Sequence, residues 1–297
     1  FEGRKGLYCT NMGVPIGEHT WHAALVSAHC AVTGAERMRS GEPYVYAMCR
    51  PPGHHAGPNF FGGYCYLNNA AIAARFLRRE GGRVAILDID YHHGNGTQAV
   101  FYRDPGVWYG SLHVDPNTDY PFYAGYADET GEGAGQGTNC NLPLPPGICE
   151  RRYLAALDTL LWQLVSFEPR WLVVSAGFDT YIHDPIGSFQ VTTDGFWQIG
   201  GRIRTLGLPT LVVQEGGYCV PDLGPNVVAL LSGLTGLHTK ARRRELDDYE
   251  SEKETQTTPA QAKAALSTST AGGNERPVRA PPADPKDSPH QPQGTSS

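Results

Sequence analysis

Residues 84–93, Val-Ala-Ile-Leu-Asp-Ile-Asp-Tyr-His-His, decide the fold and place the chemistry. Their apolar beginning is typical of a strand buried on both faces of a parallel sheet. Residues two apart in a strand point the same way, so Asp88, Asp90 and His92 line one face. Such a buried cluster is costly without a positive charge between its carboxylates. The stretch alone leaves a divalent-metal site and a solvated loop open, and residues 94–96 (Gly-Asn-Gly) predict a sharp turn after it.

Short apolar runs alternate with helical patterns along the chain. Strands are predicted at Tyr44–Met48, Arg83–Leu87, Val107–Leu112, Trp171–Ser175 and Thr210–Val213. Helices are predicted at Asn68–Glu80, Glu150–Val165, Asp194–Leu206 and Asp222–Leu237. This alternation predicts an α/β fold, with a mostly parallel central sheet and helices on both faces.

Composition limits the class of partner and compartment. The 297 residues carry a net charge of −6, and no Lys/Arg-rich stripe precedes residue 240, which argues against nucleic acid and permits a cationic partner. The seven cysteines form no CxxC pair, as is typical of reduced thiols. Because neither a membrane-length apolar run nor a signal peptide is visible, we expect a cytoplasmic protein that does not bind membranes.

The two ends of the chain differ from its middle. Residues 1–239 are predicted to form the catalytic domain, and residues 240–297, rich in Thr, Ser, Ala and Pro, a disordered tail. Phe1 is not an initiator Met, and no strand-like run opens the first forty residues. We therefore expect a chain that begins inside a longer protein and lacks its N-terminal part.

Polar groups follow each predicted strand. They are Pro52-Gly53-His54-His55, Asp88-Ile89-Asp90-Tyr91-His92, Ser111-Leu112-His113, Ser175-Ala176-Gly177-Phe178-Asp179 and Glu215-Gly216-Gly217-Tyr218. Ligands of open α/β sheets bind outside the carboxyl ends of the strands. Each segment alone could be a structural turn, but together they predict one site.

Residue type assigns the roles within that site. Asp90, His92 and Asp179 offer a divalent ion two oxygens and one nitrogen, leaving a position open for water and substrate. Such an ion acidifies water and polarises a carbonyl. His54 and His55 suit a general base and a general acid near neutral pH.

Three further polar side chains complete the predicted reaction. Asp88 is placed to hydrogen-bond one histidine ring and fix its tautomer. Tyr218 follows two glycines and can direct its hydroxyl toward a developing oxyanion. Glu215 is expected to support a loop. The reaction that uses these parts is metal-assisted hydrolysis of an amide.

Four motifs carry a resemblance to a known family. They are residues 50–57 (RPPGHHAG), 62–69 (GGYCYLNN), 87–98 (LDIDYHHGNGTQ) and 215–218 (EGGY). The chain resembles the histone deacetylase superfamily over about residues 8–237, most of all its bacterial acetylpolyamine amidohydrolases and class II relatives. The resemblance implies an arginase–deacetylase fold with about eight strands, and a homodimer whose formation is in doubt without an N-terminal segment.

The resemblance also implies ions. Asp90, His92 and Asp179 match zinc ligands, and Fe²⁺ suits the same donor set. His54, His55 and Tyr218 match the catalytic residues, with Asp88 as the partner of the first histidine. A structural K⁺ site is implied at Asp88, Asp90, His92, Ser111 and Leu112. Asn95 stands in the second shell, where class I enzymes carry Asp, so the pKa of His55 should be lower here.

The substrate is left open by the sequence. Tyr64 and Tyr120 match the walls of an acyl-lysine channel, the Gly63 carbonyl could accept the substrate N–H, and Ile186 takes the place of a gatekeeper Glu in a polyamine-specific relative. The acidic loop of residues 114–137 suits a cationic acetylpolyamine. Protein acetyllysine is the alternative substrate. Two further hypotheses for the function are a non-catalytic fragment of such an enzyme and, less favoured, a binuclear ureohydrolase.

Overall fold

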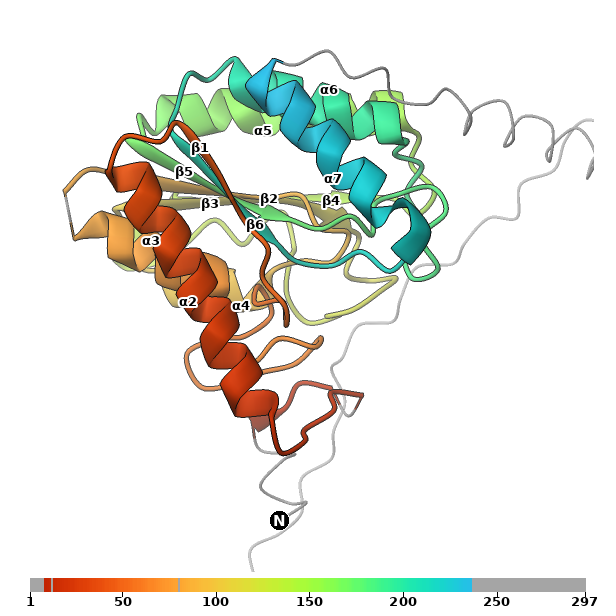
Figure 1. Cartoon of the computed structure of the whole chain (residues 1–297), viewed down its shortest axis with the longest axis horizontal. Coiled ribbons are helices and arrows are strands. Elements are labelled where there is room, and N and C mark those ends of the chain that lie inside the picture. Colours follow the sequence, from red (N-terminus) through yellow and green to blue (C-terminus); the bar gives the residue numbers. More distant parts are fainter. Residues whose placement is uncertain (1–7, 12, 80, 237–297) are drawn as a thin grey trace, which may run out of the picture. The chain divides into compact units, whose positions relative to one another are not determined.

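One parallel sheet organises the residues that the computed structural model describes, which are 8–11, 13–79 and 81–236. Its strands are β1 (Tyr44–Ala47), β2 (Val84–Asp88), β3 (Val107–Val114), β4 (Asn139–Leu144), β5 (Trp171–Ala176) and β6 (Thr210–Gln214). The order is β1-β6-β5-β2-β3-β4, and every neighbouring pair is parallel (Figure 1). The predicted α/β fold and its five strands are confirmed. The described residues hold six strands, where the resemblance implied about eight.

Helices cover both faces of the sheet. They are α2 (Thr20–Arg39), α3 (Asn69–Arg78), α4 (Asn95–Phe101), α5 (Glu150–Ser166), α6 (Thr193–Arg204) and α7 (Val220–Thr235), with a short 3₁₀ turn, η1 (Gly133–Gly135). Figure 1 shows α2, α3 and α4 on one face and α5, α6 and α7 on the other. Strand β2 serves both layers, because Ala85 and Leu87 pack in the α5–α7 core while Val84 and Ile86 pack in the α2–α3 core.

The segment after β2 corrects one prediction. Residues 94–96 do not form a free turn; helix α4 begins there, with Gly94 at its N-cap. A Cβ on Gly94 would lie 2.3 Å from Asp88 Oδ2, and one on Gly96 would lie 2.3 Å from the Ala56 carbonyl oxygen. The glycines are therefore required by close packing of this helix end against β2 and the loop after β1.

The topology leaves a crevice at the carboxyl end of the sheet. From β2 the chain proceeds to β3 and β4 on one side, and then returns to β5 and β6 on the other. Neighbours β2 and β5 thus send their following loops in opposite directions, which is the arrangement that creates ligand sites in open α/β sheets.

Some predictions concern residues beyond this description. The boundary at residue 239 and the tail of residues 240–297 lie outside the described residues, as do Glu80 and Leu237, the predicted ends of two helices. Among the helices that are described, none has the length and apolar character needed to cross a membrane.

Candidate active site

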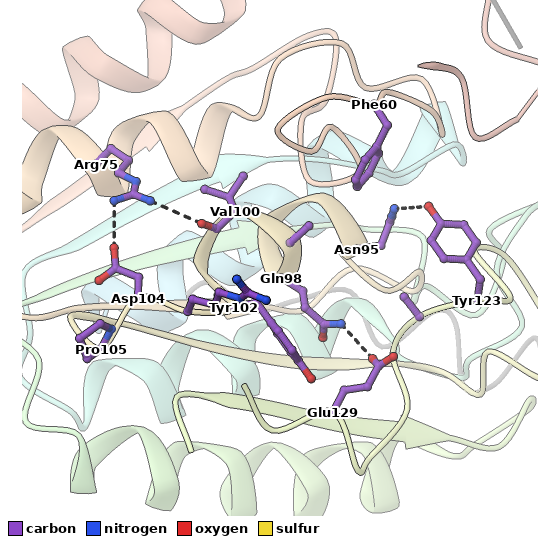
Figure 2. Close-up of a pocket in the computed structure, with 13 residues that line it drawn as sticks. Phe60, Arg75, Asn95, Gln98, Val100, Tyr102, Asp104, Pro105, Tyr123 and Glu129 are labelled. Atoms are coloured by element: carbon purple, nitrogen blue, oxygen red, sulfur yellow. Dashed lines mark hydrogen bonds and ion pairs between the residues drawn. The ribbon is translucent and has the colours of Figure 1, made fainter. Parts of the chain in front are cut away.

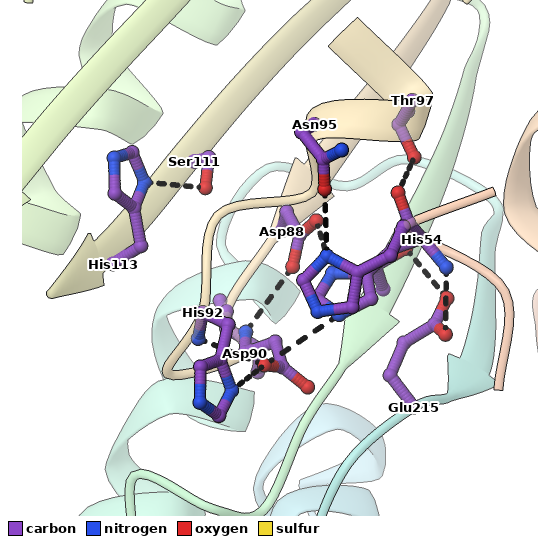
Figure 3. Close-up of polar contacts among 12 residues, drawn as sticks. His54, Asp88, Asp90, His92, Asn95, Thr97, Ser111, His113 and Glu215 are labelled. Atoms are coloured by element: carbon purple, nitrogen blue, oxygen red, sulfur yellow. Dashed lines mark hydrogen bonds and ion pairs between the residues drawn. The ribbon is translucent and has the colours of Figure 1, made fainter. Parts of the chain in front are cut away.

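Asp90, His92 and Asp179 meet in the crevice between β2 and β5. One potential ligand atom from each lies within 4.8 Å of the others. The Nδ1 atom of His92 is 3.0 Å from Asp179 Oδ2. It is 3.4 Å from Asp90 Oδ1, and Figure 3 shows these two residues beside His54. All three side chains are buried. The sequence predicted this convergence from separate strand ends.

Two carboxylates, those of Asp90 and Asp179, lie close together in this buried cluster. Burial raises the pKa of Asp179 to about 7, and the negative charge of Asp90 adds to the effect. Burial acts in the same direction on Asp90, but the positive charges of His54 and His92 outweigh it and hold the pKa of Asp90 below its ordinary range. Adjacent buried carboxylates resist joint ionisation unless a positive ion lies between them. Two oxygens and one imidazole nitrogen fit a divalent metal.

Backbone N–H groups from neighbouring loops fix the two carboxylates. Tyr91 donates to Asp179 Oδ1 at 2.9 Å, so the β2 loop holds the β5 carboxylate. Gly216 donates to Asp90 Oδ2 at 3.0 Å, so the β6 loop holds the β2 carboxylate. Backbone donors from another strand's loop therefore orient each of the two carboxylates.

His54 lies between two aspartates. Its Nδ1 is 3.1 Å from Asp88 Oδ2, and its Nε2 is 3.7 Å from Asp90 Oδ1. Asp88 Oδ2 also accepts a 3.0 Å hydrogen bond from the Tyr109 hydroxyl. Burial acts to lower the pKa of His54, but the charges of Asp90 and Asp88 raise it well above its ordinary value. The predicted Asp88–histidine contact is thus present, and it selects His54.

His55 has an uncharged partner instead. Its Nδ1 is 2.8 Å from Asn95 Oδ1, while Asn95 Nδ2 donates to the Tyr123 hydroxyl at 2.7 Å. With the amide in this orientation, Nδ1 of His55 carries the proton and Nε2 is free. Burial, followed by the charges of His54 and His92, lowers the pKa of His55 well below its ordinary value. The hydrogen bond to Asn95 acts to raise this pKa, so the effect of Asn in place of Asp stays a prediction.

Glu215 supports the histidine loop, as predicted. Its Oε2 accepts hydrogen bonds from the backbone N–H groups of Gly53 at 2.6 Å and His54 at 3.2 Å, and its Oε1 accepts from the Ser175 hydroxyl at 3.1 Å. Burial raises the pKa of Glu215 to about 7. This carboxylate connects the loop after β1 and strand β5 to its own loop after β6.

Tyr218 follows Glu215 on the same loop, immediately before α7. Burial raises the pKa of its hydroxyl well above the ordinary value, so the group remains a protonated donor. Its ring meets that of Tyr64 edge-on, with 6.1 Å between centroids. Tyr64 is 42% exposed and has a φ of 64°, which is unlike a packed core aromatic.

The remaining predicted substrate contacts surround this area. The Tyr120 ring stands edge-on to His55 at 4.8 Å between centroids, and its hydroxyl lies 2.8 Å from Thr10 Oγ1. Gly63 lies against the same histidine, because a Cβ there would be 2.2 Å from His55 Cδ2. Ile186 is 42% exposed. Tyr120 and Gly63 thus lie against His55, while contacts of Tyr120, Gly63 and Ile186 with a substrate stay predictions.

The predicted K⁺ ligands come from β2, the loop after it, and β3. Asp88 and Ser111 are paired in register across these strands, with Leu112 next along β3. The Ser111 hydroxyl lies 2.8 Å from His113 Nδ1, and His113 Nε2 lies 2.8 Å from the Gly125 carbonyl oxygen. The ring therefore donates from Nε2 and accepts the serine proton at Nδ1. Potassium binding itself stays a prediction.

His93 points away from the metal ligands, as expected for the residue after His92. It is fully buried, and its ring packs against His113 with 4.6 Å between centroids. Burial lowers the pKa of His93 well below the ordinary value, which favours the neutral ring.

The acidic loop is less available to a cation than its composition suggested. Glu129 accepts hydrogen bonds from the Gly125 backbone at 2.7 Å and from Gln98 Nε2 at 2.9 Å. Glu132 pairs with Arg103 at 2.7 Å. These two carboxylates hold the loop together, while attraction of a cationic substrate by the acidic loop stays a prediction.

Two pockets lie beside the polar cluster. The first, of about 760 Å³, touches the cluster only through Asn95 (Figure 2). Arg75 lines this pocket, but its guanidinium group already forms an ion pair with Asp104, with 2.9 Å between Nη1 and Oδ2. The second, of about 720 Å³, is lined by Tyr64 and Tyr218 among others. The second pocket is the better candidate for substrate, because it contains the predicted oxyanion donor.

Two contributors were missed by sequence reasoning. Tyr123 supports Asn95 from an exposed loop, and nothing in its sequence context indicates that partner. Asp184 was given no role from the sequence, yet it is buried and its carboxylate accepts a hydrogen bond from the backbone N–H of Tyr218. An Asp-Pro pair in the loop after the Asp179 segment was the available signal.

Sequence comparison agrees with the fold and the cluster. The histone deacetylase domain family matches residues 3–234. The chain therefore belongs to the histone deacetylase family, and it is a hydrolytic deacetylase with an arginase–deacetylase fold.

Named relatives fall within two branches of that family. Acetylpolyamine amidohydrolase 1 of Pseudomonas aeruginosa is 50% identical over 235 residues, covering 79% of this chain and 68% of the relative. A histone deacetylase-like amidohydrolase of the same species is 38% identical over 232 residues, covering 74% and 60%. The crystal structure of acetylpolyamine aminohydrolase from Burkholderia pseudomallei matches with a TM-score of 0.76 and 48% identity, covering 78% of this chain and 68% of that one.

Proposed function

We propose that this protein is a zinc-dependent amidohydrolase that removes acetyl groups from acetylated polyamines or similar small acetylated amines. The observation that carries the proposal is the buried Asp90–His92–Asp179 cluster with His54 beside it. The 50% identity to an acetylpolyamine amidohydrolase supports the substrate class. Fe²⁺ is the alternative metal, because the same donor set accepts either ion.

The donor set suits a Lewis acid. A divalent ion held by Asp90, His92 and Asp179 would polarise the acetyl carbonyl and acidify water. The protein supplies the fixed carboxylates, tied by the backbone of Tyr91 and Gly216, and a setting from which bulk water is largely excluded. Electrostatic interactions are stronger in such a setting than in water.

The two histidines divide the proton transfers. His55 has the lowered pKa and, with its proton on Nδ1, offers Nε2 as the base that accepts a proton from the attacking water. His54, whose pKa is raised by Asp90 and Asp88, is the group that protonates the leaving amine. Tyr218 keeps its phenolic proton and donates a hydrogen bond to the oxyanion.

Substrate preference is tested by direct comparison. Purified zinc-loaded protein is assayed with N-acetylputrescine and with an acetyllysine peptide, and kcat/KM is measured for each. We expect the polyamine to be preferred. The 38% identity to a histone deacetylase-like amidohydrolase makes acetyllysine the second candidate, and clear preference for the peptide would replace the first. Asp179→Ala, prepared in the same way, controls for contaminating hydrolases.

A further inference from the structure

The carboxylate of Asp184 connects two loops of the site. Its Oδ2 accepts hydrogen bonds from the backbone N–H groups of Tyr218 at 2.7 Å and Cys219 at 3.1 Å. Its Oδ1 accepts from Ile186 at 2.9 Å and Gly187 at 3.3 Å. Asp184 is 6% exposed, and it lies on the loop that also carries Asp179. One buried side chain therefore fastens the loop after β6 to the loop after β5.

The tyrosine loop needs such an anchor. Tyr218 follows Gly216 and Gly217, and Gly217 has a φ of 130°, a conformation that glycine adopts without strain. Two successive glycines restrict the backbone weakly, so the direction of the tyrosine side chain must be set by other contacts. A bond to the N–H of Tyr218 itself acts at the atom next to its Cα. Charge-assisted bonds of this kind are about twice as strong as neutral ones.

We propose that Asp184 is a positioning residue for Tyr218: it fixes the tyrosine backbone so that the phenolic hydroxyl stands where the oxyanion develops. This inference rests on the proposed function. A misplacement of about 1 Å at a reacting group costs about 100-fold in rate. The same carboxylate holds Ile186 at the exposed rim, so the site's rim and its oxyanion donor share one anchor.

Asp184→Asn is the sharpest variant, because it preserves shape. An amide has one acceptor oxygen, so its NH₂ group must face either the Tyr218 and Cys219 donors or the Ile186 and Gly187 donors. The variant therefore breaks one of the two pairs of hydrogen bonds without leaving a cavity. With the oxygen kept toward Ile186, kcat falls by about 10- to 100-fold while KM changes little.

A double-mutant cycle separates positioning from general damage. Asp184→Asn is measured alone and combined with Tyr218→Phe, using N-acetylputrescine, or the acetyllysine peptide if that is the substrate. If Asp184 acts through the tyrosine hydroxyl, the Asn substitution changes kcat by less than about twofold once the hydroxyl is removed. An equal loss of kcat in both backgrounds overturns the proposal.

Hydrogen exchange supplies a readout that is independent of activity. In Asp184→Ala, which removes the acceptors of all four backbone N–H groups, the amides of Tyr218 and Cys219 should exchange at least about tenfold faster. Unchanged exchange there overturns the proposal even if kcat falls. If the wild-type protein hydrolyses neither substrate, the proposed function fails, while exchange still reports whether Asp184 holds the loop.

Glu150→Gln is the matched control. Glu150 Oε2 likewise accepts from a backbone N–H, that of Thr192 at 2.9 Å, and from the Thr192 hydroxyl at 2.7 Å. This contact joins the start of α5 to the N-cap of α6. We expect faster exchange near Thr192 with kcat unchanged. A loss of kcat equal to that of Asp184→Asn would mean that any substitution of a carboxylate that accepts backbone hydrogen bonds disturbs the site, which overturns a specific role.

Discussion

Individual carboxylates in this protein hold a neighbouring strand's loop as well as their own. Asp179 accepts from the backbone of the β2 loop, Asp90 from that of the β6 loop, and Glu215 from that of the β1 loop. Asp184 in turn holds the tyrosine loop after β6. The loops after β1, β2 and β6 are thus each fixed by a carboxylate from another strand's loop, which keeps reactive groups in place where regular structure is lacking.

Replacement of one hydroxyl tests the role of Tyr218. Tyr218→Phe should lower kcat by about 100- to 1000-fold, because it removes a donor to the oxyanion, with only a modest change in KM. Steady-state kinetics at a fixed zinc content measures both constants. Tyr126→Phe, which removes a hydroxyl bonded to the Phe122 carbonyl on the outer loop, is the control. Near-normal turnover of Tyr218→Phe would contradict the assignment.

Glu215 should make stability depend on pH. Burial raises its pKa from 4.5 to about 7, so its protonated form stabilises the fold. The contribution is fully present below pH 4.5 and is lost as the pH rises through about 7. It amounts to at most about 3 kcal/mol. Glu215→Gln mimics the protonated acid and should flatten this part of the profile.

Denaturant unfolding of the metal-free protein between pH 4 and pH 8 measures the effect. This range includes both the ordinary pKa of the Glu215 carboxyl, 4.5, and its raised pKa of about 7 in the folded protein. The difference in unfolding free energy between Glu215→Gln and the wild type should grow with pH in favour of the variant. A difference that is independent of pH would show that Glu215 does not titrate in this range.

The helices and strands differ in how clearly they could be predicted from the sequence. Strand β2 is apolar on both faces, so its pattern was unambiguous. Strand β4 was missed because Asn139, Asn141 and Pro143 interrupt the apolar pattern, which is tolerated at the edge of the sheet. Helix α2 is rich in alanine and lacks a strong apolar stripe, and α4 begins at glycines that normally indicate a turn.

Substitution of Asn68, the N-cap of α3, tests whether a helix cap also supports the site. Its Oδ1 caps α3 by accepting from Ala71 N at 2.9 Å, and its Nδ2 donates to the Ala56 carbonyl at 2.9 Å, next to His55. Asn68→Ala should lower the unfolding free energy by about 2–4 kcal/mol, since both a cap and a further buried bond are lost. It should also lower kcat.

The matched variant is Thr192→Ala, which removes the N-cap of α6, where Thr192 Oγ1 accepts from Gly195 N at 3.1 Å. We expect a stability loss of about 1–2 kcal/mol without loss of kcat. Denaturant unfolding and steady-state kinetics are measured on both proteins. Equal kinetic effects would show that α3 capping has no separate connection to the histidine loop.

At the scale of the whole molecule, topology explains why the sequence could group the three candidate metal ligands. Ligand groups sit at the ends of apolar strands, and parallel strands bring these ends to one edge. Asp90, His92 and Asp179 could therefore be grouped before their distances were known. Asp184 and Tyr123 could not, because they act through loop conformations, which follow no periodic pattern.

The central claim is that Asp90, His92 and Asp179 bind one catalytic divalent metal. The most direct measurement is metal content and N-acetylputrescine hydrolysis after chelation and titration with Zn(II), with anaerobic Fe(II) in parallel. We predict no turnover without metal, recovery at about one equivalent, and neither tight binding nor turnover in Asp179→Ala. Full turnover by metal-free protein, or stoichiometric zinc in Asp179→Ala, would contradict the claim.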